Sequence, residues 1–285
     1  MPAPPPDARS FRSAVVSVTP CGDDGVLLRI RPERGLPPVR ASRFFMLRRE
    51  DALSPAIPRP FSIYRQHGHE LEFLIKVMGK GSSALAQCVP GTSIRTVGPL
   101  GNGWPTLSGG GAPWVMLAGG VGSAPFYMAI EQALRGMDGT RPAALSELHF
   151  LFGAARAGLL YDIAAVERLG VRVHTATIDG SHGHKGNVLQ LLEALQRAGT
   201  LPERVRVLAC GPERMLEAVA SWCDARGLDC WLSLETLMGC GVGICNACPI
   251  PTRREGPRGA WPNVKCCVEG PVFKSDEIAL HALGH

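Results

Sequence analysis

The sequence predicts a multidomain β plus α/β protein: an antiparallel β-barrel, then a Rossmann-like domain with a parallel sheet, then a small cysteine-rich domain. Three observations predict this. Short apolar strands separated by Gly and Pro recur up to about residue 97, strand and helix patterns alternate over 114–227, and cysteines gather after residue 232. Short strands with many turns are typical of barrels or sandwiches, whereas the alternation specifies a parallel sheet wound on both faces.

Composition fits a compact globular chain with room for two or three domains, since it has 285 residues and a slightly positive mean hydropathy. A net charge of +5, evenly scattered, argues against nucleic acid as a partner. We expect a soluble cytoplasmic protein without a signal peptide or membrane span, because the Pro-rich start lacks an apolar core and the uncharged stretch 96–130 is broken by glycines and prolines. In that compartment ten cysteines indicate metal ligands, redox groups or buried thiols rather than disulfides.

The first part of the chain begins with a predicted disordered, Pro-rich lead at residues 1–10. Residues 11–108 form the predicted barrel. Its strands are expected at 14–19, 26–30, 43–48, 61–65, 71–78 and 93–98. The Gly-rich segment 106–113 is the expected linker to the next domain.

Residues 109–231 form the predicted α/β domain. We expect its strands at 114–120, 147–154, 171–178 and 204–211, and its helices at 124–136, 161–170, 187–199 and 212–227. Residues 232–285 form the third predicted domain, which carries the cysteine cluster.

The cysteine cluster has the spacing C-x4-C-x2-C at Cys240, Cys245 and Cys248. Plant-type ferredoxins hold a [2Fe–2S] cluster with three close thiolates in this order and one distant thiolate. The distant ligand would be Cys266 or Cys267, which are adjacent, and the spacing does not choose between them.

Zinc is the alternative metal, because it also accepts four thiolates. Structural zinc sites usually consist of two C-x2-C pairs, and the region contains only one. Gly239, Gly241 and Gly243 also suit a cluster, since they allow the backbone to wrap closely and to direct N–H groups at anionic sulfurs. We therefore favour iron–sulfur over zinc.

A glycine turn at 118–125 follows a buried strand and opens a helix. Gly119, Gly120 and Gly122 would let a phosphate approach the backbone at the helix start. The alternative is an ordinary glycine turn of an α/β domain, because the motif departs from G-x-G-x-x-G. A second glycine turn, at 209–212, lies at the carboxyl end of another strand, the edge where α/β sheets bind ligands.

A second candidate phosphate site lies in the barrel, where Arg59 and Ser62 precede a Gly-Ser turn at Gly81 and Ser82. An arginine, a hydroxyl and a helix start together suit a pyrophosphate. A strand start followed by a helix N-cap explains the same residues, and the two interpretations stay open.

The order of these motifs resembles the ferredoxin–NADP reductase superfamily. The ending "LMGCGVGICNACPIP…CCVEGPVF" is similar to one branch of it, the electron-transfer subunits of NAD-linked dihydroorotate dehydrogenases. The resemblance covers roughly residues 12 to 280 and implies FAD, a [2Fe–2S] cluster and NAD(P)H as cofactors. The positions that match the flavin-contacting segments are Arg59, Pro60, Phe61, Ser62, Leu74, Ile75, Lys76, Gly81 and Ser82.

The resemblance also implies a nicotinamide cofactor over the turn 119–122, with Cys210 beside the nicotinamide as the catalytic candidate. In the family the last cluster ligand precedes an x-acidic-Gly-Pro-Val-Phe sequence, which selects Cys267 over Cys266. The loop 249–265 departs from the family, being long and Pro-rich.

That loop carries Arg253, Arg254 and Arg258. The arginines could form a basic patch that faces a partner. We prefer the simpler interpretation, a solvated surface loop.

The function implied by the resemblance is electron transfer between NAD+ and a partner dihydroorotate dehydrogenase catalytic subunit, in pyrimidine biosynthesis. The partner would carry FMN, and the two chains would form a hetero-oligomer. The alternatives are a stand-alone NAD(P)H reductase that feeds an oxygenase or another redox partner, and a zinc-stabilised binding module without redox activity. The sequence does not separate NAD from NADP, because no acidic residue stands about 20 positions beyond Gly122.

Overall fold

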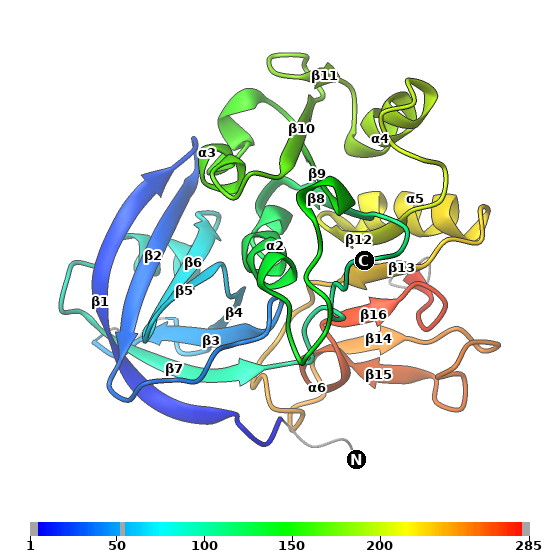
Figure 1. Ribbon diagram of the computed structural model, residues 1–285. Helices are drawn as coiled ribbons and strands as arrows, with labels where there is room; N and C mark the ends of the chain where they lie inside the picture. The colour runs from blue at the N-terminus through cyan, green and yellow to red at the C-terminus, as the bar shows by residue number, and fades with distance from the viewer. Residues whose placement is uncertain (1–4, 52–54, 281–285) are drawn as a thin grey trace.

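The computed structural model describes residues 5–51 and 55–280. Two large sheets and a small hairpin make up the protein (Figure 1). One large sheet is curled and antiparallel, and the other is mostly parallel with helices on both faces, so the predicted fold class is confirmed.

The antiparallel sheet has the strand order β4-β3-β7-β1-β2-β6-β5. Its strands are β1 (Arg9–Cys21), β2 (Gly25–Pro32), β3 (Phe44–Arg49), β4 (Arg59–Ser62), β5 (Arg65–His67), β6 (Glu70–Lys76) and β7 (Ser93–Leu100), and helix α1 (Lys80–Ala86) lies between β6 and β7 in the chain. The two edge strands follow one another directly in sequence. The sheet therefore curls until its edges are joined, and Tyr64 N–H donates to the Glu72 carbonyl across the junction at 2.9 Å.

The structure differs from the expected elements of this part at two places. Arg9 and Ser10 belong to β1 and pair with Gly98 and Val97 of β7, so they are not part of a disordered lead, and residues 1–4 lie outside the described residues. The run 61–65 is not one strand but two strand ends joined by buried Ile63 and Tyr64, because the chain turns there to close the barrel.

The second sheet has the order β11-β10-β9-β8-β12-β13-β16. Its strands are β8 (Trp114–Gly119), β9 (Leu148–Ala154), β10 (Arg172–Thr177), β11 (His184–Lys185), β12 (Arg206–Cys210), β13 (Cys230–Ser233) and β16 (Val272–Lys274). Its helices are α2 (Phe126–Arg135), α3 (Ile163–Glu167), α4 (Val188–Arg197) and α5 (Glu213–Asp224). All strand pairings in this sheet are parallel except that of β13 with β16. The direction in which successive strands are added reverses between β8 and β12, and α/β sheets bind ligands at such a point.

The hydrophobic core has two halves, one on each face of this sheet. Helices α2 and α3 cover one face and share their apolar cluster with the barrel interior. Helices α4 and α5 cover the other face, together with the cysteine-containing segment and the outer barrel residues Phe44 and Met46. The apolar periodicity of each helix is what fixes the face that it buries.

The cysteine-containing segment is built into the second sheet rather than attached to it. The predicted boundary between residues 231 and 232 falls inside β13, and β16 extends the sheet beyond that strand. The rest of the segment comprises the hairpin of β14 (Pro249–Pro251) and β15 (Asn263–Lys265), followed by the single turn α6 (Cys266–Glu269). Sequence patterns missed these three-residue strands because they are too short to show periodicity.

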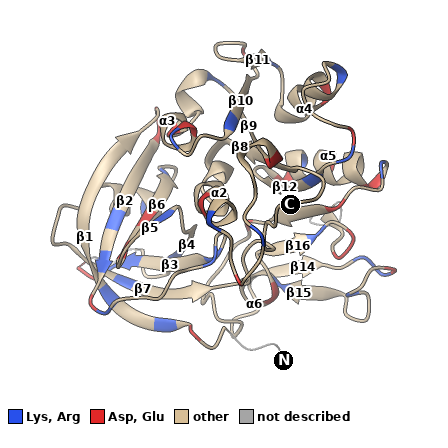
Figure 2. Ribbon diagram, viewed as in Figure 1, with Lys and Arg blue, Asp and Glu red and all other residues tan. Residues whose placement is uncertain are grey.

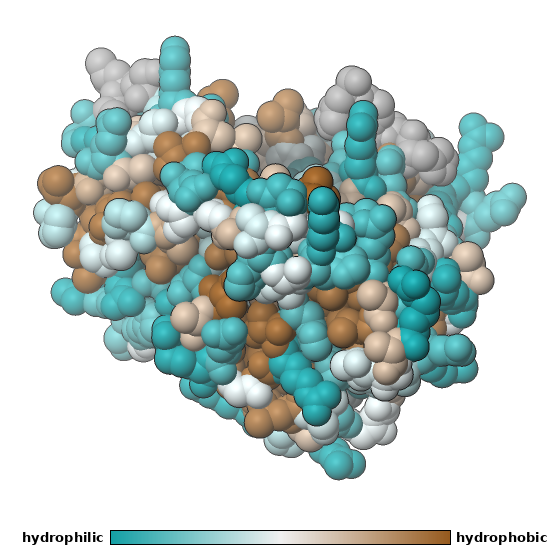
Figure 3. Space-filling view, turned by 90° about the horizontal axis from the view of Figure 1, so that it is seen from above, coloured by the Kyte–Doolittle hydropathy of each residue, from teal (hydrophilic) through white to brown (hydrophobic). Residues whose placement is uncertain are grey.

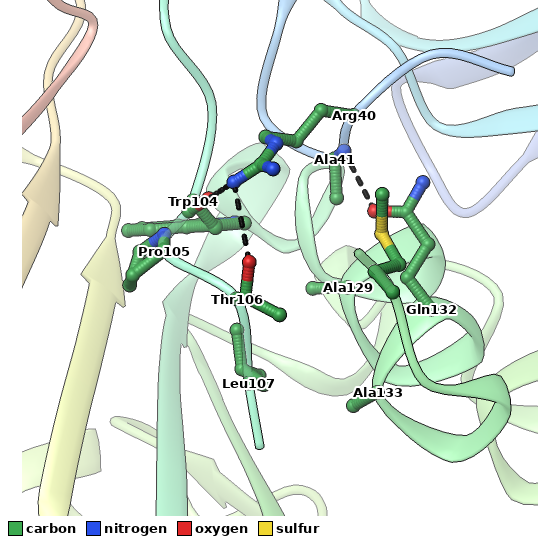
Figure 4. A pocket seen from close by; sticks show the side chains of 10 residues that line it. Arg40, Ala41, Trp104, Pro105, Thr106, Leu107, Ala129, Gln132 and Ala133 are labelled. Atoms are coloured by element: carbon green, nitrogen blue, oxygen red, sulfur yellow. Dashed lines mark hydrogen bonds between the residues drawn. The ribbon is translucent and has the colours of Figure 1, made fainter. Parts of the chain in front are cut away.

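The barrel and the second sheet meet along a seam that Figure 4 shows from close by. Gln132 of α2 accepts from the Ala41 N–H at 3.0 Å and donates to the Val39 carbonyl at 2.7 Å. Arg40 donates to the Trp104 carbonyl of the connecting segment at 3.3 Å. The Trp104 ring stacks on Phe126, so the connection between the domains is packed rather than loose.

Among the described residues, no helix combines the length and the apolar character needed to cross a membrane. In the view from above, hydrophilic side chains cover most of the surface and apolar ones show between them (Figure 3).

Candidate functional site

A cavity of about 410 Å³ opens between the barrel and the second sheet. Its barrel wall comes from β4, β6 and the start of α1, and includes the predicted flavin positions Arg59, Pro60, Phe61, Ser62, Leu74, Lys76, Gly81 and Ser82. Its other wall comes from the turn after β8 and from residues 234–238, which follow β13. Segments far apart in the sequence thus form one site at the domain junction.

Arg59 lies across the start of α1. A Cβ at Gly81 would come within 2.8 Å of the Arg59 Cγ, so only glycine lets the arginine side chain lie this close to the backbone. Arg59 Nη1 donates to the Ile57 carbonyl at 3.0 Å, and the guanidinium keeps further donors for a ligand in the cavity. This arrangement fits a phosphate-bearing cofactor.

Ser82 has a structural task in the same turn. Its hydroxyl accepts from the N–H groups of Met78 at 2.9 Å and Gly79 at 3.1 Å, and donates to the Gly79 carbonyl. The hydroxyl therefore closes the turn before α1, as the capping interpretation expects.

Strand β6 presents alternate residues to the cavity. Leu74 and Lys76 line it, whereas Ile75 between them is fully buried in the barrel core. The side chain of Ile75 is thus on the wrong face to touch a ligand, because successive strand residues point to opposite sides.

A second cavity, of about 530 Å³, lies over the carboxyl ends of β8 and β12, where the strand order reverses. Gly119, Gly120 and Gly122 line it together with the second glycine turn, which begins at Gly211. Two of these glycines are needed for packing: a Cβ at Gly122 would lie 2.4 Å from the Cys210 carbonyl oxygen, and one at Gly119 would lie 2.7 Å from Pro212. Gly120 has a φ of +54° and nothing within 4 Å of its Cβ position, so it is the glycine that offers open backbone to a ligand.

The two cavities share a wall. Lys76, Met78, Val121 and the segment 234–237 line both of them. Ligands bound in the two cavities would therefore meet over these residues.

Cys210 lines neither cavity and is buried beside Ser233 of the neighbouring strand. Burial raises the pKa of its thiol far above the usual value, so the thiol stays neutral. Its backbone carbonyl packs against Gly122, which places the residue directly beneath the glycine turn. The predicted role of Cys210 beside the nicotinamide stays a prediction.

Glu235 is a site residue that the sequence-based argument missed. It lies in the shared wall, and its side chain is exposed to solvent. The protein that lines this wall partly desolvates the carboxyl and raises its pKa. One signal was available: Glu235 is the only charged residue between Asp229 and Arg253.

The four predicted cluster ligands lie on one loop and the turn α6 that packs beneath it. Cys248 and Cys267 bring their sulfurs to 3.3 Å from one another, and the Cys240 sulfur accepts from the Cys245 N–H at 3.4 Å. Among the described residues, no three Cys, His, Asp or Glu side chains converge on a point that would suit a single metal ion. Four thiols arranged as two pairs fit a two-iron cluster, which takes two thiolates on each iron, better than one zinc ion.

Hydrogen bonds favour the thiolate form at two of these sulfurs, those of Cys240 and Cys248. Burial alone would raise the pKa of Cys240, but the N–H groups of Cys245 and Val242 that donate to its sulfur lower the pKa to about 7. The hydrogen bond shared with Cys267 lowers the pKa of Cys248 to about 6 and raises that of Cys267. Thiolates are the form that binds iron, so the loop is suited to hold a metal cluster.

Cys266 is directed elsewhere. It is fully buried and its sulfur lies 3.8 Å from the Leu234 carbonyl, whereas Cys267 lies against Cys248. The pKa is raised at both thiols, by burial at Cys266 and by the hydrogen bond with Cys248 at Cys267, so the directions of the two sulfurs distinguish them and their pKa values do not. The geometry agrees with the selection of Cys267 by resemblance.

The arginines of the loop 249–265 are largely held within the protein. Arg253 pairs with Asp224 at 2.6 Å and donates to the Ile278 carbonyl, and Arg258 pairs with Glu277 at 3.1 Å. They do not form a free basic patch. The hairpin itself lines the second cavity through Pro249, Ile250, Pro251 and Asn263.

Two family models match the chain. The model of the iron–sulfur cluster binding domain of dihydroorotate dehydrogenase B matches residues 235–279, and that of the oxidoreductase NAD-binding domain matches residues 116–221. Among curated relatives, the electron transfer subunit of dihydroorotate dehydrogenase B (NAD(+)) from Clostridium acetobutylicum is 32% identical over 85% of this chain and 87% of its own length. The subunit of the same name from Enterococcus faecalis is 35% identical over 78% of this chain and 80% of its own length.

Solved structures show the same fold. A structure of the NADH-dependent reduced ferredoxin–NADP oxidoreductase superposes with a TM-score of 0.76 at 23% identity, covering 95% of this chain and 91% of that one. The ferredoxin reductase of carbazole 1,9a-dioxygenase superposes with a TM-score of 0.64 at 19% identity, covering 78% and 67% of the two chains. At these identities the likeness concerns the fold alone.

Proposed function

The chain belongs to the family of electron-transfer subunits of dihydroorotate dehydrogenase B, and on that premise we propose that it passes electrons between a dihydroorotate dehydrogenase catalytic subunit and NAD+ in pyrimidine biosynthesis. Its cofactors are FAD, a [2Fe–2S] cluster and NAD(H). The partner would carry FMN and form a hetero-oligomer with this chain.

Each cofactor has a set of residues suited to it. When bound, the nicotinamide supplies or takes a hydride, the flavin converts the electron pair into single electrons, and the cluster carries one electron at a time. Arg59 and the start of α1 would hold the FAD pyrophosphate, and Gly120 would offer its backbone to the dinucleotide. Cys240, Cys245, Cys248 and Cys267 would hold the cluster.

The observation that carries this proposal is the continuity of one segment, residues 234–240. Its first residues form the wall shared by the two cavities, Met238 lines the flavin cavity, and Cys240 is the first predicted cluster ligand. One short stretch therefore borders the nicotinamide side, the flavin side and the cluster side. A protein that passes electrons between a two-electron carrier and a one-electron carrier needs their binding sites to adjoin one another in this way.

The chain's own residues orient and separate the reacting groups rather than exchange protons with them. Lys76 and Met78 stand at the contact between the two cavities, where they would set how a nicotinamide approaches a flavin. The apolar side chains of Val121 and Leu234 exclude water from the same place.

The test uses the isolated chain and the reconstituted complex. We expect the isolated chain to reduce ferricyanide with NADH but not to oxidise dihydroorotate with a dye. Adding the catalytic subunit of the source organism should link dihydroorotate oxidation to NAD+ reduction.

Cys248→Ser should abolish that linkage while NADH-dependent ferricyanide reduction through the flavin continues. Turnover of dihydroorotate by the isolated chain, or unchanged coupling in Cys248→Ser, would contradict the proposal. The visible spectrum provides a further check, since a colourless protein that contains zinc would indicate a non-redox module instead.

A further inference from the structure

Three arginines form a row on the outer face of the barrel sheet, which we call the arginine row: Arg48, Arg95 and Arg12. Arg48 of β3 is opposite Arg95 of β7, and Arg95 is opposite Arg12 of β1, so the row crosses three neighbouring strands. Their neighbours Leu47, Ile94 and Phe11 face the barrel core and are buried. The arginines must therefore point outward, because successive strand residues alternate between faces.

The arginine row lies beside the cysteine loop. Met46, two residues before Arg48 on the same face, packs against this loop: a Cβ at Gly241 would lie 2.6 Å from the Met46 Cγ. Two strand residues span about 7 Å, so the row starts one step beyond the contact. Within the loop, Ile244 is 80% exposed and the next residue, Cys245, also reaches the surface.

The charges of the row are only partly neutralised. Glu50 pairs with both Arg12 at 2.9 Å and Arg95 at 3.0 Å. Arg48 has no carboxylate partner among the residues that the structure describes. Three arginines and Glu50 leave a charge of +2, and Glu33, whose carboxylate accepts from the Arg12 N–H at 3.4 Å, reduces it to +1. Lys and Arg accordingly gather where β1, β3 and β7 run side by side (Figure 2).

We propose that the arginine row is the docking surface for an acidic face of the electron-transfer partner, with exposed Ile244 as the neighbouring apolar contact. The inference rests on the proposed function, since it assumes that electrons leave through the cysteine loop. A row of like charges across three strands disfavours the sheet itself, because like charges opposite one another repel. A partner that presents carboxylates would remove this repulsion and would be steered to the side of the molecule where the cluster is held.

The alternative basic region offers less to a partner. In the loop 249–265, Arg253 pairs with Asp224 and Arg258 with Glu277, so each has a carboxylate of its own. In the arginine row, Arg12 and Arg95 share the single carboxylate of Glu50, so the row keeps more uncompensated positive charge.

The experiment measures binding of the catalytic subunit of the source organism to the full chain by surface plasmon resonance, at low and high salt. We expect Arg48→Glu to slow association about tenfold at low salt and to flatten the salt dependence, because steering acts on the association rate. Arg168→Glu is the matched control: it makes the same change of charge at the exposed residue that follows α3, away from the arginine row, and should change association less than twofold. Arg48→Gln should give an intermediate rate.

Reduction of a neutral quinone by NADH should be unchanged in Arg48→Glu, which shows that the variant is folded and carries its cofactors. Suppose that the wild-type chain and its partner link dihydroorotate oxidation to NAD+ reduction, but Arg48→Glu binds the partner at the wild-type rate. The proposed docking surface would then be wrong, and the proposed function would stand. An equal decrease of the association rate in Arg168→Glu would also overturn the proposed docking surface, since the effect would then come from net charge. Failure of the wild-type chain to couple or bind would remove both proposals.

Discussion

Cys266 and Cys267 are adjacent in the chain, but their sulfurs have different surroundings. The turn α6 directs Cys267 to Cys248 and Cys266 to the Leu234 carbonyl. The spacing of the cysteines could not distinguish them, because a distant fourth ligand has no fixed separation from the first three. The direction of a side chain in a single helical turn is set by tertiary packing.

We expect Cys267→Ser to lose iron and Cys266→Ser to retain it, because only Cys267 joins the second thiol pair. Iron and inorganic sulfide are measured in the purified variants. Flavin content is the control and should be equal in both, since the flavin cavity is lined by other residues. Iron lost from Cys266→Ser and kept in Cys267→Ser would reverse the assignment.

Glu235 gives a pH dependence whose sign can be worked out. Its pKa is raised in the folded protein, so the folded state holds the proton more tightly than the unfolded state. Folding is then favoured most below the carboxyl's ordinary pKa, and this contribution is lost as pH rises through the folded-state pKa. Above that point the ionised carboxylate destabilises the ligand-free protein.

Glu235→Gln should therefore raise the melting temperature of the cofactor-free protein slightly at neutral pH, because solvent screens an exposed carboxylate, and should have little effect at a pH below the ordinary carboxyl pKa. Thermal unfolding of both proteins across that range measures the difference. Glu255→Gln, in the loop 249–265, is the control and should show no such trend. A stabilisation that is the same at all pH values would rule out titration of Glu235 as its cause.

At the scale of elements, the two glycine turns after β8 and β12 pack backbone against backbone. The sequence predicted both turns and their place at the strand ends, since alternating strands and helices fix that edge. It could not predict that Gly119 and Gly122 serve mainly this packing and that Gly120 is the open position. The contact joins residues about 90 positions apart, which no local pattern reports.

The two kinds of glycine should respond differently to alanine. Gly122→Ala places a methyl group 2.4 Å from the Cys210 carbonyl oxygen, so backbone must move, and we expect a loss of more than about 3 kcal/mol of stability. Gly120→Ala meets no atom within 4 Å and should cost only about 1 kcal/mol, for its positive φ. Urea unfolding measures both values, and a larger loss for Gly120→Ala would contradict this account.

The other elements were predicted as far as their length allowed. The helices of the second sheet and most barrel strands were expected at their observed places, because each shows several repeats of its apolar period. The strands β11, β13, β14, β15 and β16 were not, since two to four residues show no period. Most of the motif residues identified in the sequence line the two cavities, whereas Glu235 and the arginine row depend on segments that only the fold brings together.

At the scale of the whole molecule, a buried charge network joins the barrel to the second sheet. Arg65 lies between the rings of Tyr64 and Tyr127, 4.4 and 4.3 Å from their centroids, and pairs with Asp162 and with Glu72. Tyr64 also donates to Asp162 at 2.9 Å. Asp162 precedes α3, so this one carboxylate connects the two domains.

Asp162→Asn should cost about 3 kcal/mol of unfolding free energy, because it leaves Arg65 buried with one fewer partner. Asparagine tolerates the left-handed backbone of this position, where φ is +48°, so the change isolates the charge. Glu167→Gln on the exposed side of α3 is the control and should cost less than about 0.5 kcal/mol. Equal effects of the two changes in urea unfolding would show that the network does not stabilise the junction.

The strand β16 has a kinetic consequence. It belongs to the cysteine-containing segment in the chain, yet it pairs with β13 as the edge of the second sheet, and Cys266 and Cys267 share a core with α5 and the outer barrel. A segment anchored by strand pairing and a common core cannot swing as a tethered carrier between two docking positions. Internal electron transfer should then proceed without waiting for domain motion, and its rate in stopped-flow experiments should be independent of solvent viscosity when glycerol is added.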